Sequence, residues 1–133
     1  MGLFWEVFGR FYGLYYLVVG TVVLLGRAGV IKSKPIIHPT QTANDFMLAL
    51  YKTGYFFPMI AVAYIAGGVA MQVPQTLPLG LAILAGPVAG ITAFHFFLSK
   101  RYAWGMAFGL SFAAIALRHM DAFVPLWSHT AGY

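Results

Sequence analysis

The sequence predicts an all-α polytopic membrane protein, an up-down bundle of four transmembrane helices in a single domain spanning residues 1–133. Two observations lead to this prediction. Hydrophobic residues make up 61% of the chain and charged residues 8%, with a mean hydropathy of +0.81. The apolar residues also fall into four stretches, each close to the roughly 20 helical residues that cross a bilayer core of about 30 Å. These stretches lie at about residues 5–26, 55–73, 77–99 and 102–118.

The first stretch contains a charged residue, Arg10, which has two interpretations. Glu6 precedes it by four residues. Because residues at this spacing share one face of a helix, the two side chains are expected to form an ion pair near the outer end of the helix. The alternative is that Arg10 binds an anionic ligand, since charged groups within membranes often mark functional sites.

The connection between the first two stretches is the longest in the chain. Pro35 and Pro39 favour extended backbone there. A short amphipathic helix is expected at about residues 42–52, capped by Thr42 or Asn44. We expect this helix to lie along the membrane surface and to cover the mouth of the bundle, where a lipid-like ligand would enter.

The last two stretches carry small residues at four-residue spacing, and these predict the seam between them. The residues are Gly86, Gly90, Gly105 and Gly109. In lipid, helices associate through close backbone approach at such positions. Pro58 and Pro87 are expected to kink their helices, because proline removes a helical hydrogen bond.

The charges predict topology. The chain has eight Lys and Arg residues against three Asp and Glu, a net charge of +5. Six of the cations fall in the connections at one face of the predicted bundle: Arg27, Lys32, Lys34, Lys52, Lys100 and Arg101. Since basic loops stay in the cytoplasm, both termini are expected on the other side. In a chain this apolar, the positive charge indicates topology and not nucleic-acid binding.

The sequence offers no complete catalytic or metal-binding set. It has no cysteine, and its serines lack the context of an activated nucleophile. None of the three carboxylates has a helical spacing to a histidine that would favour a metal site. His95 and His119 are expected at opposite ends of the bundle, and Pro39 argues against a preorganised pair of His38 with His95. We therefore expect no bound metal, no haem and no intrinsic cofactor.

A set of short motifs within residues 50–100 resembles the DoxX-like family of small four-helix membrane proteins. The motifs are Thr53-Gly54-Tyr55 followed by Pro58, then Gly67-Gly68, Pro78-Leu79-Gly80, Pro87 and Phe94-His95. The family includes the membrane subunit of thiosulfate:quinone oxidoreductase. The resemblance implies a multi-pass protein of the bacterial inner membrane linked to redox or quinone metabolism, with both termini periplasmic on the charge argument.

Tyr64 is a departure from the family. Many members have an acidic residue at this position, six residues after the proline of the second span. A tyrosine hydrogen-bonds at ordinary pH but does not ionise as a carboxylate does. If a quinone or lipid headgroup binds, the candidate ligand-binding residues are Arg10, Tyr64 and His95.

These observations leave two functional hypotheses. The first is a non-catalytic accessory subunit that packs against a larger electron-transport or photosynthetic complex, with its polar tail, residues 127–133, on a neighbouring subunit. The alternative is a quinone- or lipid-binding membrane component of an oxidoreductase. Under either hypothesis, the expected partners are membrane lipids and other membrane-protein subunits, with no nucleic acid.

Overall fold

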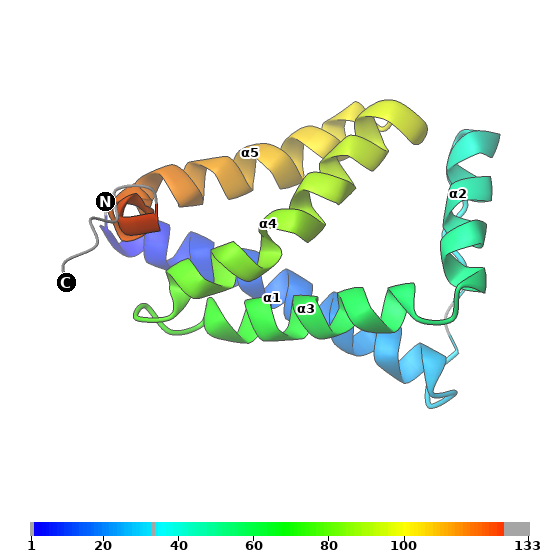
Figure 1. Cartoon of the computed structure of the whole chain (residues 1–133), viewed down its shortest axis with the longest axis horizontal. Helices are drawn as coiled ribbons and strands as arrows, with labels where there is room; N and C mark the ends of the chain where they lie inside the picture. Colours follow the sequence, from blue (N-terminus) through cyan, green and yellow to red (C-terminus); the bar gives the residue numbers. More distant parts are fainter. Residues whose placement is uncertain (1, 33, 127–133) are drawn as a thin grey trace, which may run out of the picture.

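The computed structural model describes residues 2–32 and 34–126. All regular secondary structure in these ranges is helical, with no β-strand, which confirms the all-α class. Four long helices run alternately in opposite directions, with the start of α1 and the end of the described chain at the same end (Figure 1). The elements are α1 (Gly2–Arg27), α2 (Gln41–Lys52), α3 (Phe56–Ala70), α4 (Leu77–Ala93), the π-helix η1 (Phe94–Leu98), α5 (Tyr102–Arg118), α6 (Met120–Phe123) and the 3₁₀-helix η2 (Val124–Leu126). The predicted tail contact at residues 127–133 lies outside the described residues.

Two of these helices are long and apolar enough to cross a membrane: α1, and α4 continued by η1. α3 has 15 residues and α5 has 17. They are therefore roughly 22 and 26 Å long, somewhat short of a bilayer core of about 30 Å. Each belongs to a bent pair, α2 with α3 at 91° and α5 with α6–η2 at 78°. If each bent pair counts as one span, the described chain has up to four.

Glycines bring the backbones of α1, α3 and α4 into direct contact. A Cβ atom added at Gly68 of α3 would lie 2.5 Å from the carbonyl oxygen of Gly13 in α1. One added at Gly80 of α4 would lie 2.7 Å from the carbonyl oxygen of Gly67 in α3. Such close approach is how helices associate in lipid. Fully buried side chains of the hydrophobic core are Tyr16, Met71, Leu81, Leu84 and Ile115.

The predicted seam between the last two long helices is wrong for Gly86 and Gly90. Both are exposed, and a Cβ added at either would meet nothing within 4 Å. Gly105 and Gly109 do face the preceding helix, where their added Cβ atoms would lie 2.9 Å from the Phe96 ring and 3.1 Å from Thr92. The two α5 glycines thus contact side chains of the preceding helix. The face of α4 that packs against α3 is the one that carries Gly80, not the one with Gly86 and Gly90.

One of the two prolines differs from expectation. Pro58 lies in the first turn of α3, where its missing N–H would have had no partner inside the helix. It therefore breaks no hydrogen bond within α3, which begins at Phe56, and is not expected to kink the helix. Pro87 lies inside α4, and the π-helix η1 follows that helix directly.

The cap of α2 is Thr40, not Thr42 or Asn44. The Thr40 hydroxyl accepts a hydrogen bond from the Ala43 N–H at 3.2 Å, and it donates to the carbonyl oxygen of Leu98 at the end of η1. The Thr40 side chain thus caps the N-terminus of α2 and also joins α2 to the end of η1. As a result α2 lies across the end of the bundle, steeply inclined to the long helices (Figure 1).

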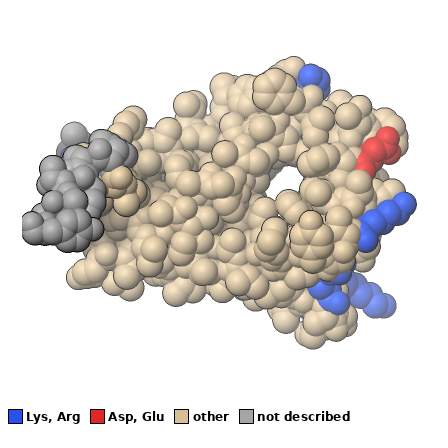
Figure 2. Space-filling model, in the orientation of Figure 1, with Lys and Arg blue, Asp and Glu red and all other residues tan. Residues whose placement is uncertain are grey.

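Lys and Arg side chains gather at the end of the molecule that carries α2 (Figure 2). The same view shows an opening through the molecule, between α2 and the body formed by α3 and α4. Charge and shape therefore distinguish this end from the other, where the chain starts.

Candidate functional site

A cluster of hydrogen-bonded polar side chains lies where η1 meets the connection before α2. The π-helix widens the backbone over Phe94–Leu98, a feature that often occurs at functional sites. Nδ1 of His95 lies 2.8 Å from Oγ of Ser99, which is fully buried. The Ser99 hydroxyl also accepts a hydrogen bond from the N–H of Arg101 at 3.3 Å. These bonds orient the His95 imidazole at the end of the α4–η1 helix.

His38 packs against this cluster from the connection. Its side chain is 8% exposed, and its ring lies edge-on to Phe94 at 4.8 Å and 6.5 Å from the ring of His95, measured between centroids. Asn44 holds the His38 backbone, accepting from its N–H at 2.8 Å and donating to its carbonyl oxygen at 3.0 Å. Burial, and then the positive charge of Arg101, lower the pKa of His38. The lowered pKa favours the neutral form of the imidazole.

One atom of this cluster lacks a partner among the described residues. Nδ1 of His38 is buried and makes no hydrogen bond within them. Buried polar groups are nearly always satisfied, so an orphan of this kind calls for a ligand, a water or a proton-linked role.

The sequence argument against a preorganised pair of His38 and His95 is therefore wrong. Pro39 makes the connection irregular, but two long-range bonds fix it. Thr40 donates to the carbonyl of Leu98, and Nη2 of Arg101 donates to the carbonyl oxygen of Ile37 at 3.3 Å. The one signal in the sequence for this arrangement is local, because Asn44 follows His38 by six residues and is placed to bind its backbone. The residues that fix the connection from distant parts of the chain give no such signal.

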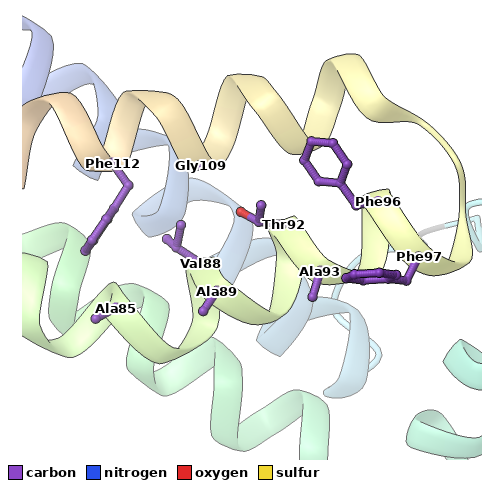
Figure 3. Close-up of a pocket in the computed structure, with 9 residues that line it drawn as sticks. All are labelled: Ala85, Val88, Ala89, Thr92, Ala93, Phe96, Phe97, Gly109 and Phe112. Carbon is purple, nitrogen blue, oxygen red and sulfur yellow. The ribbon is translucent and has the colours of Figure 1, made fainter.

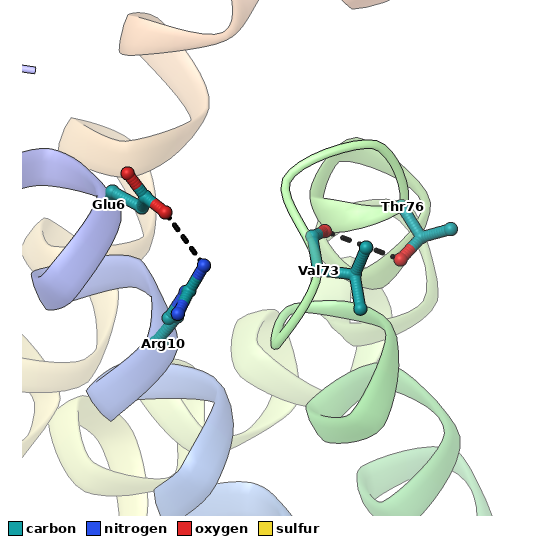
Figure 4. A network of polar contacts seen from close by, with 4 residues as sticks. All are labelled: Glu6, Arg10, Val73 and Thr76. Carbon is teal, nitrogen blue, oxygen red and sulfur yellow. Dashed lines mark hydrogen bonds and ion pairs between the residues drawn. The ribbon is translucent and has the colours of Figure 1, made fainter.

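The three predicted ligand-binding residues do not converge. Arg10 is exposed at the opposite end and pairs with Glu6 at 2.7 Å, and Figure 4 shows the two side chains pointing toward one another. Tyr64 is buried in α3, 5.1 Å from the ring of Tyr16. His95 lies in the cluster described above.

A line of aromatic rings connects Tyr64 to His95 indirectly. Tyr16 contacts the ring of Tyr64 at 5.1 Å and that of Phe108 at 6.4 Å, and Phe108 stacks on His95 at 6.2 Å. The Tyr12 hydroxyl donates to the carbonyl oxygen of Phe108 at 3.0 Å, so the Tyr16 hydroxyl, 3.0 Å away, must donate to Tyr12. Tyr12, Tyr16 and Tyr64 thus form a tyrosine cluster in the core between α1 and α3.

A separate groove of about 570 Å³ runs between α4 and α5 (Figure 3). Its lining is apolar apart from Thr92: Ala85, Val88, Ala89, Thr92, Ala93, Phe96, Phe97, Gly109 and Phe112. Oγ1 of Thr92 is buried without a hydrogen-bond partner in the described chain. Because neither histidine lines this groove, its chemistry is that of an apolar surface and differs from that of the histidine cluster.

The arrangement provides hydrogen bonding and packing. Within residues 2–32 and 34–126, no group of three or more His, Asp or Glu side chains is placed to hold a metal ion. The described chain is thus an all-helical protein with candidate membrane spans and, at its basic end, a buried His38 that packs beside the partly buried His95. No known protein family, curated protein or solved structure matches it.

Proposed function

We propose that this chain is a DoxX-like accessory subunit of a larger electron-transport or photosynthetic membrane complex, without catalytic activity of its own. In this proposal four helices cross the bacterial inner membrane, with α3 and α5 completed by the segments bent away from them. The observation that carries the proposal is an uncovered surface on α4.

This surface consists of small residues on one face of α4, all of them exposed: Ala82, Ala85, Gly86, Ala89, Gly90 and Ala93. Their spacing of three and four residues places them together along the helix. Small residues are what membrane helices use to approach one another. Ala85, Ala89 and Ala93 also line the groove beside α5, and the whole face is exposed, so it is open to a transmembrane helix of another subunit.

A matched pair of variants tests the proposal. Gly90→Leu places a large side chain on the small-residue face, whereas Ala107→Leu places one on an exposed position of α5. In native electrophoresis of membranes, the wild-type chain and Ala107→Leu should migrate with a complex, and Gly90→Leu should migrate alone. Both purified variants should keep the wild-type thermal midpoint, because both positions are exposed.

Two results would count against an accessory role. One is a Gly90→Leu chain that stays in its complex. The other is a purified wild-type chain that reduces or oxidises a quinone unaided.

The second candidate function is a quinone- or lipid-binding component of an oxidoreductase, and the unpartnered Nδ1 of His38 favours it. The imidazoles of His38 and His95 lie near one another and supply hydrogen bonds of the kind that orient a quinone oxygen. His38→Phe should release a co-purified quinone, measured by solvent extraction and chromatography, while Arg10→Gln should retain it. A quinone kept in full by His38→Phe, with an unchanged thermal midpoint, would remove the histidine pair from the site.

A further inference from the structure

The end of the molecule that carries α2 has an unbalanced positive charge. Six cations belong to its segments: Arg27, Lys32, Lys34, Lys52, Lys100 and Arg101. Asp45 is the one carboxylate there in the described chain, and it accepts a hydrogen bond from Nε2 of Gln41 at 2.7 Å. The ion pair of the described residues, Glu6 with Arg10, lies at the other end. No described carboxylate therefore neutralises these cations.

The fold gathers the basic segments and fixes them. Nη2 of Arg27 donates to the carbonyl oxygen of Gly54 at 3.0 Å, and its guanidinium lies 4.9 Å from the centroid of the Tyr51 ring. Nη2 of Arg101 donates to the carbonyl oxygen of Ile37. The Arg27 bond joins the end of α1 to the turn between α2 and α3. The Arg101 bond joins the turn before α5 to the connection before α2. Each uses one of the five N–H groups of a guanidinium, so donors remain for an anion.

Apolar side chains stand directly beside the charges. Ile36 and Ile37 are 74% and 77% exposed, and they follow the exposed Lys34 across a single proline. A segment that exposes both lysine and isoleucine suits the boundary between headgroups and acyl chains, where the cation meets phosphate and the apolar side chain meets hydrocarbon. The opening in Figure 2 lies beside this end of the molecule.

We propose that this basic end is a binding site for an anionic phospholipid. The lipid phosphate lies at the connection that carries Lys32 and Lys34. Its acyl chains run along Ile36 and Ile37 toward the opening. The charge complementarity favours a lipid with net negative charge over a zwitterionic one, because only the former leaves the unpaired cations neutralised. This site is separate from the small-residue face of α4 and does not depend on the accessory role.

The test compares ligands and variants of the full chain in non-ionic detergent, with bound lipid counted by native mass spectrometry. The ligands are phosphatidylglycerol, phosphatidylcholine and inorganic phosphate. Lys32→Gln/Lys34→Gln removes two exposed cations for which the structure gives no hydrogen bond. Arg10→Gln/Arg118→Gln is the matched control, since it removes the same charge from the opposite end.

The wild-type chain should retain phosphatidylglycerol in preference to phosphatidylcholine. The lysine variant should bind phosphatidylglycerol about 25-fold more weakly, since each basic residue near an anionic lipid contributes about fivefold. The control should bind it as the wild type does.

Three results would overturn the proposal. The first is equal binding of the two lipids. The second is equal behaviour of the two double variants, whether both lose the lipid or both keep it, because the location of the charge would then not matter. The third is full displacement of the lipid by an equal concentration of inorganic phosphate, which would make the site one for a free anion.

Discussion

The imidazole of His38 lies 6.5 Å from that of His95, although α2, α3 and α4 all separate the two residues along the chain. This contact joins the connection after α1 to the π-helix at the end of α4. His38 is buried and His95 is partly buried, and the charge of Arg101 acts on the His38 imidazole. Nδ1 of His38 has no hydrogen-bond partner in the described chain. The position of the connection should therefore respond to pH.

The first prediction is that stability falls as the pH is lowered. Burial and Arg101 hold the pKa of His38 below its ordinary value of 6.5, so between the two values the unfolded chain binds more protons than the folded one. The stabilisation is complete above pH 6.5 and is lost as the pH falls toward the folded-state pKa. Thermal midpoints measured between about pH 5 and 8 should show this decline.

His38→Gln serves as the comparison for that experiment. It removes the titrating ring but leaves the neighbouring groups His95 and Arg101 in place, so its midpoint should change less over the same range. If wild type and variant lose stability in parallel, another group is responsible.

The second prediction concerns two glycines with the same chemistry and opposite surroundings. A Cβ at Gly68 would lie 2.5 Å from the Gly13 carbonyl oxygen, whereas one at Gly90 would meet nothing within 4 Å. Gly68→Ala should therefore lower the free energy of unfolding by about 1–3 kcal/mol, the usual cost of overpacking. Gly90→Ala should change it by no more than about 0.5 kcal/mol. Unfolding in mixed micelles measures both, and equal effects would contradict the seam between α1 and α3.

The third prediction concerns the attachment of α2. Thr40→Val removes the hydroxyl that caps the helix and binds the Leu98 carbonyl. Loss of a cap costs about 1 kcal/mol, and here the helix also loses its tie to η1. Amide hydrogen exchange over Gln41–Lys52 should become faster, while Thr42→Val, inside the helix and exposed, should leave it unchanged. Faster exchange in the Thr42 variant alone would indicate that Thr42, and not Thr40, caps the helix.

These contrasts explain how far the sequence could predict the structure. The helices begin and end close to the predicted stretches, because hydrophobic runs bounded by polar residues are a local signal. Which helix packs against a face rich in glycine depends on residues far away in the sequence. α4 carries Gly80 as well as Gly86 and Gly90, and only the packing of Gly80 against Gly67 of α3 shows which face is buried.

The candidate site was harder to predict for a related reason. His95 could be selected as a polar residue within an apolar stretch. His38 could not be joined to it, since the bonds that place it run from Thr40 and Arg101 to carbonyl oxygens of Leu98 and Ile37. Every residue carries a backbone carbonyl whatever its side chain, so the sequence does not mark these acceptors.

The last prediction concerns orientation, and the absence of cysteine from the sequence makes it simple to test. Single cysteines at Lys34 and Gln75 occupy exposed positions on opposite connections, the first before α2 and the second between α3 and α4. The basic connection should face the cytoplasm by the positive-inside rule. In intact bacterial cells with a permeable outer membrane, a membrane-impermeant maleimide should therefore label Gln75→Cys and spare Lys34→Cys. After the inner membrane is permeabilised, both should react, which shows that the Lys34→Cys thiol is accessible. Labelling of Lys34→Cys alone in intact cells would reverse the proposed topology.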